Sequence, residues 1–140
     1  MIEIDPQELA GRYVGQWNLR GATERRAAVE RLWAEDATHV VQPPAEIREI
    51  AGRIGFDHQV LESRGHEAIE TRVARTYERF VGKEGFTFRP AADAVRLRDV
   101  VTFHWEMVSA ETGDVAGGGL EILLLGADGR IKADYMFPGA

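Results

Sequence analysis

The stretch LEILLLGADGRIKADYMFP, residues 120–138, decides the fold class of this chain. Between positions 131 and 137, the side chains of Ile131, Ala133, Tyr135 and Phe137 alternate with those of Lys132, Asp134 and Met136. This period of two residues is typical of a β-strand. The run from Leu120 to Leu125 is also rich in residues that favour strands. Because the intervening GADGR is a typical turn sequence, the stretch predicts a β-hairpin.

The segments that precede this hairpin divide into strand-like and helical parts. Residues 86–90, 93–97 and 100–108 read as further strands, and SAETGD at 109–114 predicts another hairpin turn. The first half has helical spacing instead, over residues 5–21, 23–36, 44–55 and 66–82, with a short extended run at 36–44. Helices followed by antiparallel strands predict an α+β fold, with the helices packed on one face of the sheet.

Composition restricts the classes of function. The chain has 140 residues, which suits a single domain over 1–140, and a formal net charge of −6, which argues against nucleic acid as a partner. It has no cysteine, so disulfides and thiolate catalysis are excluded. No apolar run is long enough to span a bilayer and the acidic N-terminus lacks the pattern of a signal peptide, so we expect a cytoplasmic protein that does not bind membranes.

Two of the expected strands are apolar on both faces. Residues 100–108 and 120–125 carry large hydrophobic side chains at both odd and even positions. One face must cover the helices, and the other is too apolar to face water alone. This predicts a homodimer through the sheet or an enclosed cavity. The three glycines 117–119 predict a β-bulge that bends the sheet.

Four segments together resemble the NTF2-like superfamily, and within it the SnoaL-like or polyketide-cyclase-like group. They are RYVGQWNLR (12–20), LWAEDATHVVQPP (32–44), GHEAIETRVARTYERF (65–80) and LLLGADGRIKADYMF (123–137). The resemblance implies a cone of about three to four helices on a strongly curved antiparallel sheet that encloses an apolar pocket. It also implies that the convex sheet face forms a dimer. Residues 45–64 fit less well and are expected to be a helical insertion.

The superfamily includes isomerases, epoxide hydrolases, dehydratases, cyclases and non-enzymatic binding proteins, so the fold does not decide the function. Its ketosteroid isomerases keep an Asp before the proline that ends the first strand. Here the position is Gln42 or Val41, neither of which can take a proton from carbon. Gln42 can still hydrogen-bond a ligand carbonyl, or it can satisfy nearby backbone.

The epoxide hydrolases of the superfamily use an Asp on the last strand, which Asp134 in DYMF resembles. They also use an Arg and an Asp two residues apart on a middle strand, where this chain has His104 and Glu106. We predict Asp134, His104 and Glu106 as catalytic groups, with Asp134 inside the pocket and within reach of the other two. The alternative is that this patch lies on the convex face and Trp105 faces the pocket. The residues expected to bind a ligand are Tyr13, Trp17, Gln42, Trp105 and Glu121.

No metal-binding motif or phosphate-binding loop is recognisable, so no metal or cofactor is expected. The sequence favours a cofactor-independent isomerase, hydratase or cyclase that acts on a small apolar or polycyclic substrate by general acid–base catalysis. The alternative is a non-catalytic module that binds a hydrophobic ligand or a protein.

Overall fold

A computed structural model describes residues 3–43, 45, 49, 53 and 61–140. Its elements are α1 (Pro6–Gln16), α2 (Ala22–Leu32), β1 (Trp33–Val41), β2 (Leu61–Arg64), α4 (Gly65–Thr76), the π-helix η1 (Tyr77–Lys83), β3 (Phe86–Pro90), β4 (Val95–Leu97), β5 (Val100–Ser109), β6 (Val115–Leu125) and β7 (Ile131–Pro138). The chain therefore has the expected α+β class, with helices first and most strands after them.

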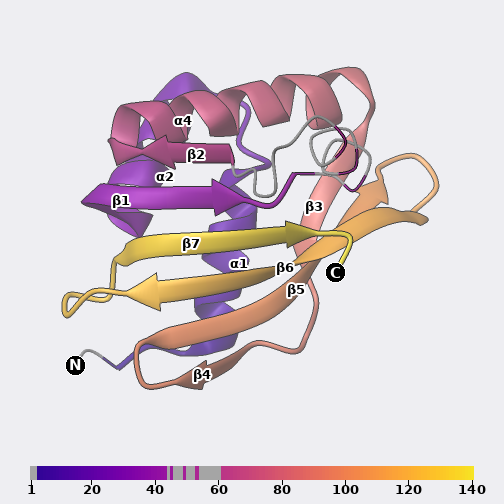
Figure 1. Ribbon diagram of the computed structural model, residues 1–140. Coiled ribbons are helices and arrows are strands. Elements are labelled where there is room, and N and C mark those ends of the chain that lie inside the picture. The colour runs from indigo at the N-terminus through magenta and orange to yellow at the C-terminus, as the bar shows by residue number, and fades with distance from the viewer. Residues whose placement is uncertain (1–2, 44, 46–48, 50–52, 54–60) are drawn as a thin grey trace.

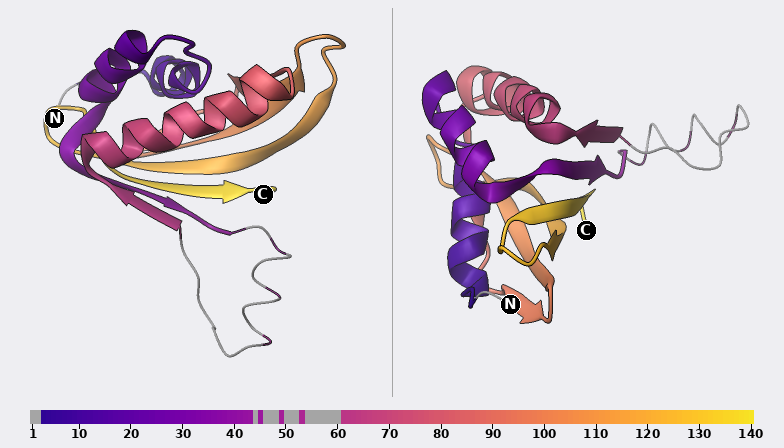
Figure 2. Two further views of the ribbon diagram at one scale, coloured as in Figure 1. Left: turned by 90° about the horizontal axis from the view of Figure 1, so that it is seen from above. Right: turned by 90° about the vertical axis from the view of Figure 1, so that its left-hand side faces the viewer.

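One curved sheet of seven strands organises the molecule (Figure 1). Its order is β2-β1-β7-β6-β5-β3, and β4 pairs separately with β5. The helices lie on the concave side of the curved strands (Figure 2). The neighbouring pairs are antiparallel, as expected, except β1 and β7, which are parallel. These two strands are far apart in the sequence, so no hairpin sets their relative direction.

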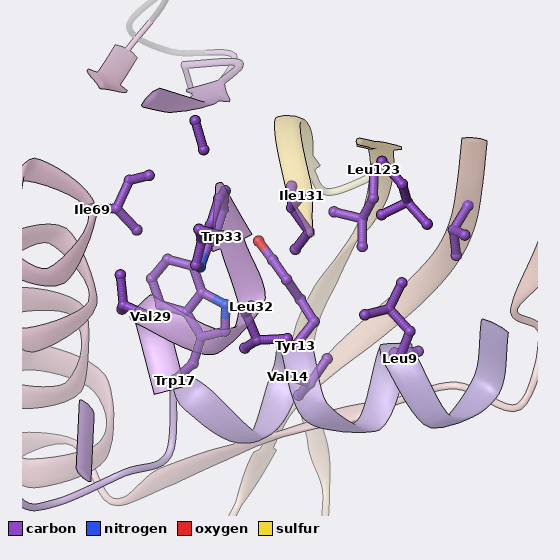
Figure 3. Close-up of a cluster of buried hydrophobic side chains, with 14 of the residues drawn as sticks. Leu9, Tyr13, Val14, Trp17, Val29, Leu32, Trp33, Ile69, Leu123 and Ile131 are labelled. Atoms are coloured by element: carbon purple, nitrogen blue, oxygen red, sulfur yellow. The ribbon is translucent and has the colours of Figure 1, made fainter. Parts of the chain in front are cut away.

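Helix α1 supplies the centre of the core. Asp5 caps it by accepting a hydrogen bond from the Gln7 amide at 3.0 Å, and Pro6 occupies its first turn. The buried side chains recur at helical spacing along one face. They are Leu9, Ala10, Tyr13, Val14 and Trp17. Figure 3 shows this face packed against residues of α2, β1, β6 and β7.

The expected second helix, 23–36, is wrong at its end, because α2 stops at Leu32 and Trp33 begins β1. Trp33 is fully buried, pairs with Ile131 of β7, and donates a hydrogen bond from Nε1 to Gln16 Oε1 at 2.9 Å. These tertiary contacts outweigh the local helical pattern, which continues to Asp36.

The expected helical insertion at 45–64 falls mostly outside the described residues. Its last four residues, Leu61–Arg64, form strand β2 and pair with the end of β1. Within the described part of the chain, no helix is long and apolar enough to cross a membrane.

A bulge lies beside the three glycines, one residue before the position that the sequence predicts. The register between β5 and β6 shifts between Met107 and Val108, where Gly117 and Val115 are the successive partners. The next residue, Gly118, lies so close to β5 that an added Cβ would meet the Trp105 carbonyl oxygen at 2.5 Å. Glycine there permits close contact between the two strands at the rim of the sheet.

We expect Gly118→Ala to lower the free energy of unfolding by about 1–3 kcal/mol, because the methyl group would push against backbone that cannot move cheaply. Gly11→Ala is the matched control, since an added Cβ there has nothing within 4 Å. Gly11 lies inside α1, so this change should raise the stability by about 0.5–1 kcal/mol. Urea denaturation measures both values, and equal stability of Gly118→Ala and the wild type would contradict the close approach.

Candidate functional site

A cavity of about 570 Å³ opens between the helices and the concave face of the sheet. Its size suits a small molecule. Most of its lining is apolar, and α1, α4, η1 and all strands except β4 contribute to it. The polar side chains that matter for its chemistry are Tyr13, Trp17, His39, Arg72 and Trp105.

Four buried polar residues, Tyr13, His39, Glu121 and Asp134, form what we term the buried acid cluster. Each has at most 1% of its surface exposed. The sheet register brings three of them together: His39 of β1 is the direct partner of Asp134 of β7. Glu121 of β6 lies one diagonal step away, because Leu123 is the partner of Asp134. Tyr13 reaches the three from α1.

Tyr13 lies between the two carboxyl groups. Its hydroxyl donates a hydrogen bond to Asp134 Oδ2 and also lies 3.2 Å from Glu121 Oε2. The indole Nε1 of Trp105 donates to the other oxygen of Glu121 at 3.0 Å. Among the described residues, Asp134 Oδ1 has no hydrogen-bond partner.

Arg72 decides where His39 carries its proton. Its Nη1 lies 2.9 Å from His39 Nδ1. A guanidinium can only donate, so Nδ1 accepts and the ring proton lies on Nε2. That nitrogen is 3.4 Å from Asp134 Oδ2. Burial, and secondarily the charge of Arg72, lowers the pKa of His39 to about 3, so the ring is neutral at physiological pH.

The two carboxyl groups share one proton near neutral pH. Burial raises the pKa of Asp134 to about 6. Burial, and then the charge of Asp134, raises the pKa of Glu121 well above its usual range. Burial raises the pKa of Tyr13 as well. Asp134 is therefore the anion of the cluster, while Glu121 and Tyr13 keep protons that face it and His39 lies beside it as a neutral ring. Such a carboxylate is suited to general acid–base chemistry.

His39, Glu121 and Asp134 also have ligand atoms within 4.8 Å of one another, as in a metal site. The hydrogen bonds around them do not fit that use. Because Arg72 donates to Nδ1, the Nε2 that would face a metal already holds the ring proton. The cluster is thus better described as two carboxyl groups joined through Tyr13, with the neutral His39 beside them.

The structure separates the residues that the sequence grouped together. His104 and Glu106 do not reach Asp134, so that part of the prediction is wrong. In the register of β5 and β6, His104 is opposite Leu120, whereas Phe103 is opposite Glu121. Residues that oppose each other share a face, so His104 and Glu106 lie on the convex face.

On that face each has an exposed partner. His104 Nδ1 lies 2.6 Å from Asp93 Oδ2, and Arg89 Nε lies 3.1 Å from Glu106 Oε1. The other expected residues divide as follows. Tyr13, Trp17 and Trp105 line the cavity. Glu121 and Asp134 lie buried beside it and Gln42 does not line it, so the predicted position of Asp134 inside the pocket is wrong, as are the predicted places of Glu121 and Gln42 in its wall.

Two important residues were missed by the sequence analysis, His39 and Arg72. Strand alternation left the direction of His39 open, because Val40 beside it is equally compatible with the core. Arg72 borders the apolar face of α4 next to Val73, where an arginine usually faces solvent. The adjacency of His39 and Asp134 depends on the parallel β1–β7 pair, which local sequence does not reveal.

The raised pKa of Asp134 has a measurable consequence. The folded protein holds this proton more tightly than the unfolded chain, so burial of Asp134 costs little stability below pH ~4 and progressively more up to pH ~6. We expect the stability of Asp134→Asn relative to the wild type to rise by on the order of 3 kcal/mol between those limits. Chemical denaturation across this pH range measures it.

Asp128→Asn is the control for this prediction. Hydrogen bonds from Arg130 lower the pKa of the exposed Asp128, so its contribution is present at higher pH and is lost as the pH falls. The stability of Asp128→Asn relative to the wild type should therefore fall as the pH rises, opposite to that of Asp134→Asn. A pH-independent difference between Asp134→Asn and the wild type would show that Asp134 is not buried as a titrating acid.

Solved structures with the same architecture include three bacterial proteins. A candidate isomerase of the SnoaL-like family from Agrobacterium tumefaciens has a TM-score of 0.76 and 22% identity, over 96% of this chain and 97% of that one. A SnoaL-like protein of unknown function from Burkholderia thailandensis has a TM-score of 0.62 and 18% identity, over 96% and 94%. An NTF2-like protein of unknown function from Mesorhizobium loti has a TM-score of 0.59 and 17% identity, over 99% and 98%.

No family model and no curated protein matches the sequence. At these identities the structural likeness concerns the fold alone. It nevertheless covers nearly the whole chain, and it agrees with the order of helices and strands on the curved sheet. The chain therefore has the NTF2-like fold.

Proposed function

We propose that this protein is a cofactor-independent enzyme that moves a proton on a small apolar substrate bound in the cavity. One observation carries the proposal: Tyr13 and His39 belong both to the cavity lining and to the buried acid cluster. A proton can therefore pass between a bound molecule and Asp134, although Asp134 itself does not line the cavity.

The transfer uses the hydrogen bond that Tyr13 donates to Asp134. As the hydroxyl oxygen of Tyr13 accepts a proton from a substrate carbon next to a carbonyl, it gives its own proton to Asp134. The substrate becomes an enolate and Asp134 becomes neutral, so charge and protons balance. Return of the proton to another atom of the substrate completes an isomerisation. The likeness to a candidate isomerase is consistent with this class of reaction.

A second candidate is a non-catalytic module that binds an apolar ligand. The observation that favours it is the cavity wall itself, which is mostly apolar and includes neither carboxylate of the cluster. In that case the buried acids serve only to set the geometry of Tyr13 and Trp105.

The enzyme and the binding module predict different rates of proton exchange between a bound ketone and solvent. We expect the wild type to accelerate exchange of the α-hydrogens of β-tetralone with D₂O, measured by proton NMR. Tyr13→Phe and Asp134→Asn should each slow the catalysed exchange by about 100- to 10,000-fold. The rate should rise with pH through about 6, because Asp134 must be ionised to accept the proton.

Glu106→Gln is the matched control, since Glu106 is on the convex face and should leave the rate unchanged. Binding of β-tetralone without exchange would favour the non-catalytic module. Exchange that survives both Tyr13→Phe and Asp134→Asn would contradict the proposed path.

We also propose that the protein forms a homodimer through the convex sheet face. Registers across β4, β5, β6 and β7 place apolar side chains on this face in adjoining rows. They include Val95, Leu97, Ile122, Leu124 and Tyr135, of which Leu97 is 77% exposed and Val95 is 60% exposed. A second copy would remove this surface from water.

Sedimentation velocity at micromolar concentration tests the assembly. The wild type should sediment as a dimer, and Ile122→Lys should sediment as a monomer because it places a charge at the centre of the face. Glu111→Lys, in the exposed turn between β5 and β6, should leave the dimer intact. A wild type that remains monomeric would contradict the proposal.

A further inference from the structure

Arg72 is unusual among the described residues that line the cavity, because it alone carries a formal charge. It enters the cavity from α4 and is half-buried. The other titratable groups of the lining, His39 and Tyr13, are neutral near pH 7, as their shifted pKa values indicate.

The hydrogen bonds of Arg72 leave one side of its guanidinium group available. Nη1 bonds to His39 Nδ1 at 2.9 Å, and to the carbonyl oxygens of His39 and Leu61, each at 3.3 Å. Within the described part of the chain, Nε and Nη2 make no hydrogen bond. Together these two atoms form the fork that binds a carboxylate through two parallel hydrogen bonds.

No carboxylate of the described residues forms an ion pair with Arg72. By contrast, Arg89 pairs with Glu106 and Arg130 with Asp128 at the surface. Asp134 is held by donors of its own, with His39 between it and Arg72. Burial also lowers the pKa of Arg72, and the charge of Asp134 beyond His39 offsets this only in part. A bound anion would supply the missing partner.

The rest of the lining indicates what such an anion would carry. Trp17, Phe80, Phe88 and Trp105 present aromatic surface to the cavity, and Met136 adds an adaptable apolar side chain. We infer that the ligand of this cavity is an aromatic or similarly apolar acid, whose carboxylate binds to Nε and Nη2 of Arg72. This inference deepens the proposed function, on which it rests for the location of the substrate.

The test compares two probes that differ only in charge, naphthoate and its neutral amide naphthamide. Isothermal titration calorimetry at pH ~7.5, where the carboxylic acid is ionised, gives both affinities. The wild type should bind naphthoate about 10- to 100-fold more tightly than naphthamide, as expected for a hydrogen bond to a charged group. Arg72→Gln should bind the two probes equally, through loss of affinity for naphthoate alone.

Arg75→Gln, on the exposed face of the same helix, should keep the wild-type preference. Arg72→Lys keeps the positive charge but loses the two-donor fork, so it should retain part of the preference for naphthoate. Equal binding of both probes by the wild type, absence of naphthoate binding, or a preference that survives Arg72→Gln would overturn the inference. An equal loss of both affinities in Arg72→Gln would also overturn it, since that result indicates a purely structural role.

These affinities are measured without turnover. A failure of the proton-exchange experiment would therefore leave the preference for naphthoate standing. Conversely, a failure here would leave proton transfer on neutral substrates standing.

Discussion

The burial of one carboxylate, Asp134, is the constraint on which the arrangement of this protein depends. An ionised carboxylate without solvent is costly unless donors surround it. Here Tyr13 of α1 and Glu121 of β6 direct protons toward it and the neutral His39 of β1 lies beside it, so four elements must meet at one point. The sheet curves around α1, so that Tyr13 can reach the strands. The core residues that pack around Tyr13 hold its side chain in place (Figure 3).

The same constraint connects the core to the cavity. Tyr13 is part of the hydrophobic core, a donor to Asp134 and a wall of the cavity at once. His39 joins Asp134 on one side to Arg72 on the other. A buried anion, a neutral imidazole and a cation at the cavity wall therefore lie next to one another in that order. A ligand held by that cation would lie beside the groups that can exchange a proton with it.

Each face of the sheet thus has its own chemistry. The concave face holds the acids, the aromatic lining and the cation, whereas the convex face holds apolar rows together with His104 and Glu106. Two apolar faces predicted a partner surface or an enclosed cavity, and the cavity lies on the concave side. Among the described residues, the buried titratable side chains Tyr13, His39, Glu121 and Asp134 all lie on the concave side, and for that reason the catalysis is proposed there.

Much of the fold was predictable from sequence. Strand alternation, hairpin turns and helical spacing are local patterns, and they predicted the α+β class, a first helix within residues 5–21 and a bulge near Gly117. The inward burial of Asp134 also agrees with its position in the last strand.

Only the tertiary structure decided the members of the site. A period of two shows that residues alternate but not which set faces inward, and the β5–β6 register placed Glu121 with Phe103 rather than with His104. The parallel pairing of β1 with β7 brought His39 to Asp134, and the packing of α4 brought Arg72 to His39. Such long-range pairings depend on how distant segments bury their surfaces together, which no local pattern of residues encodes.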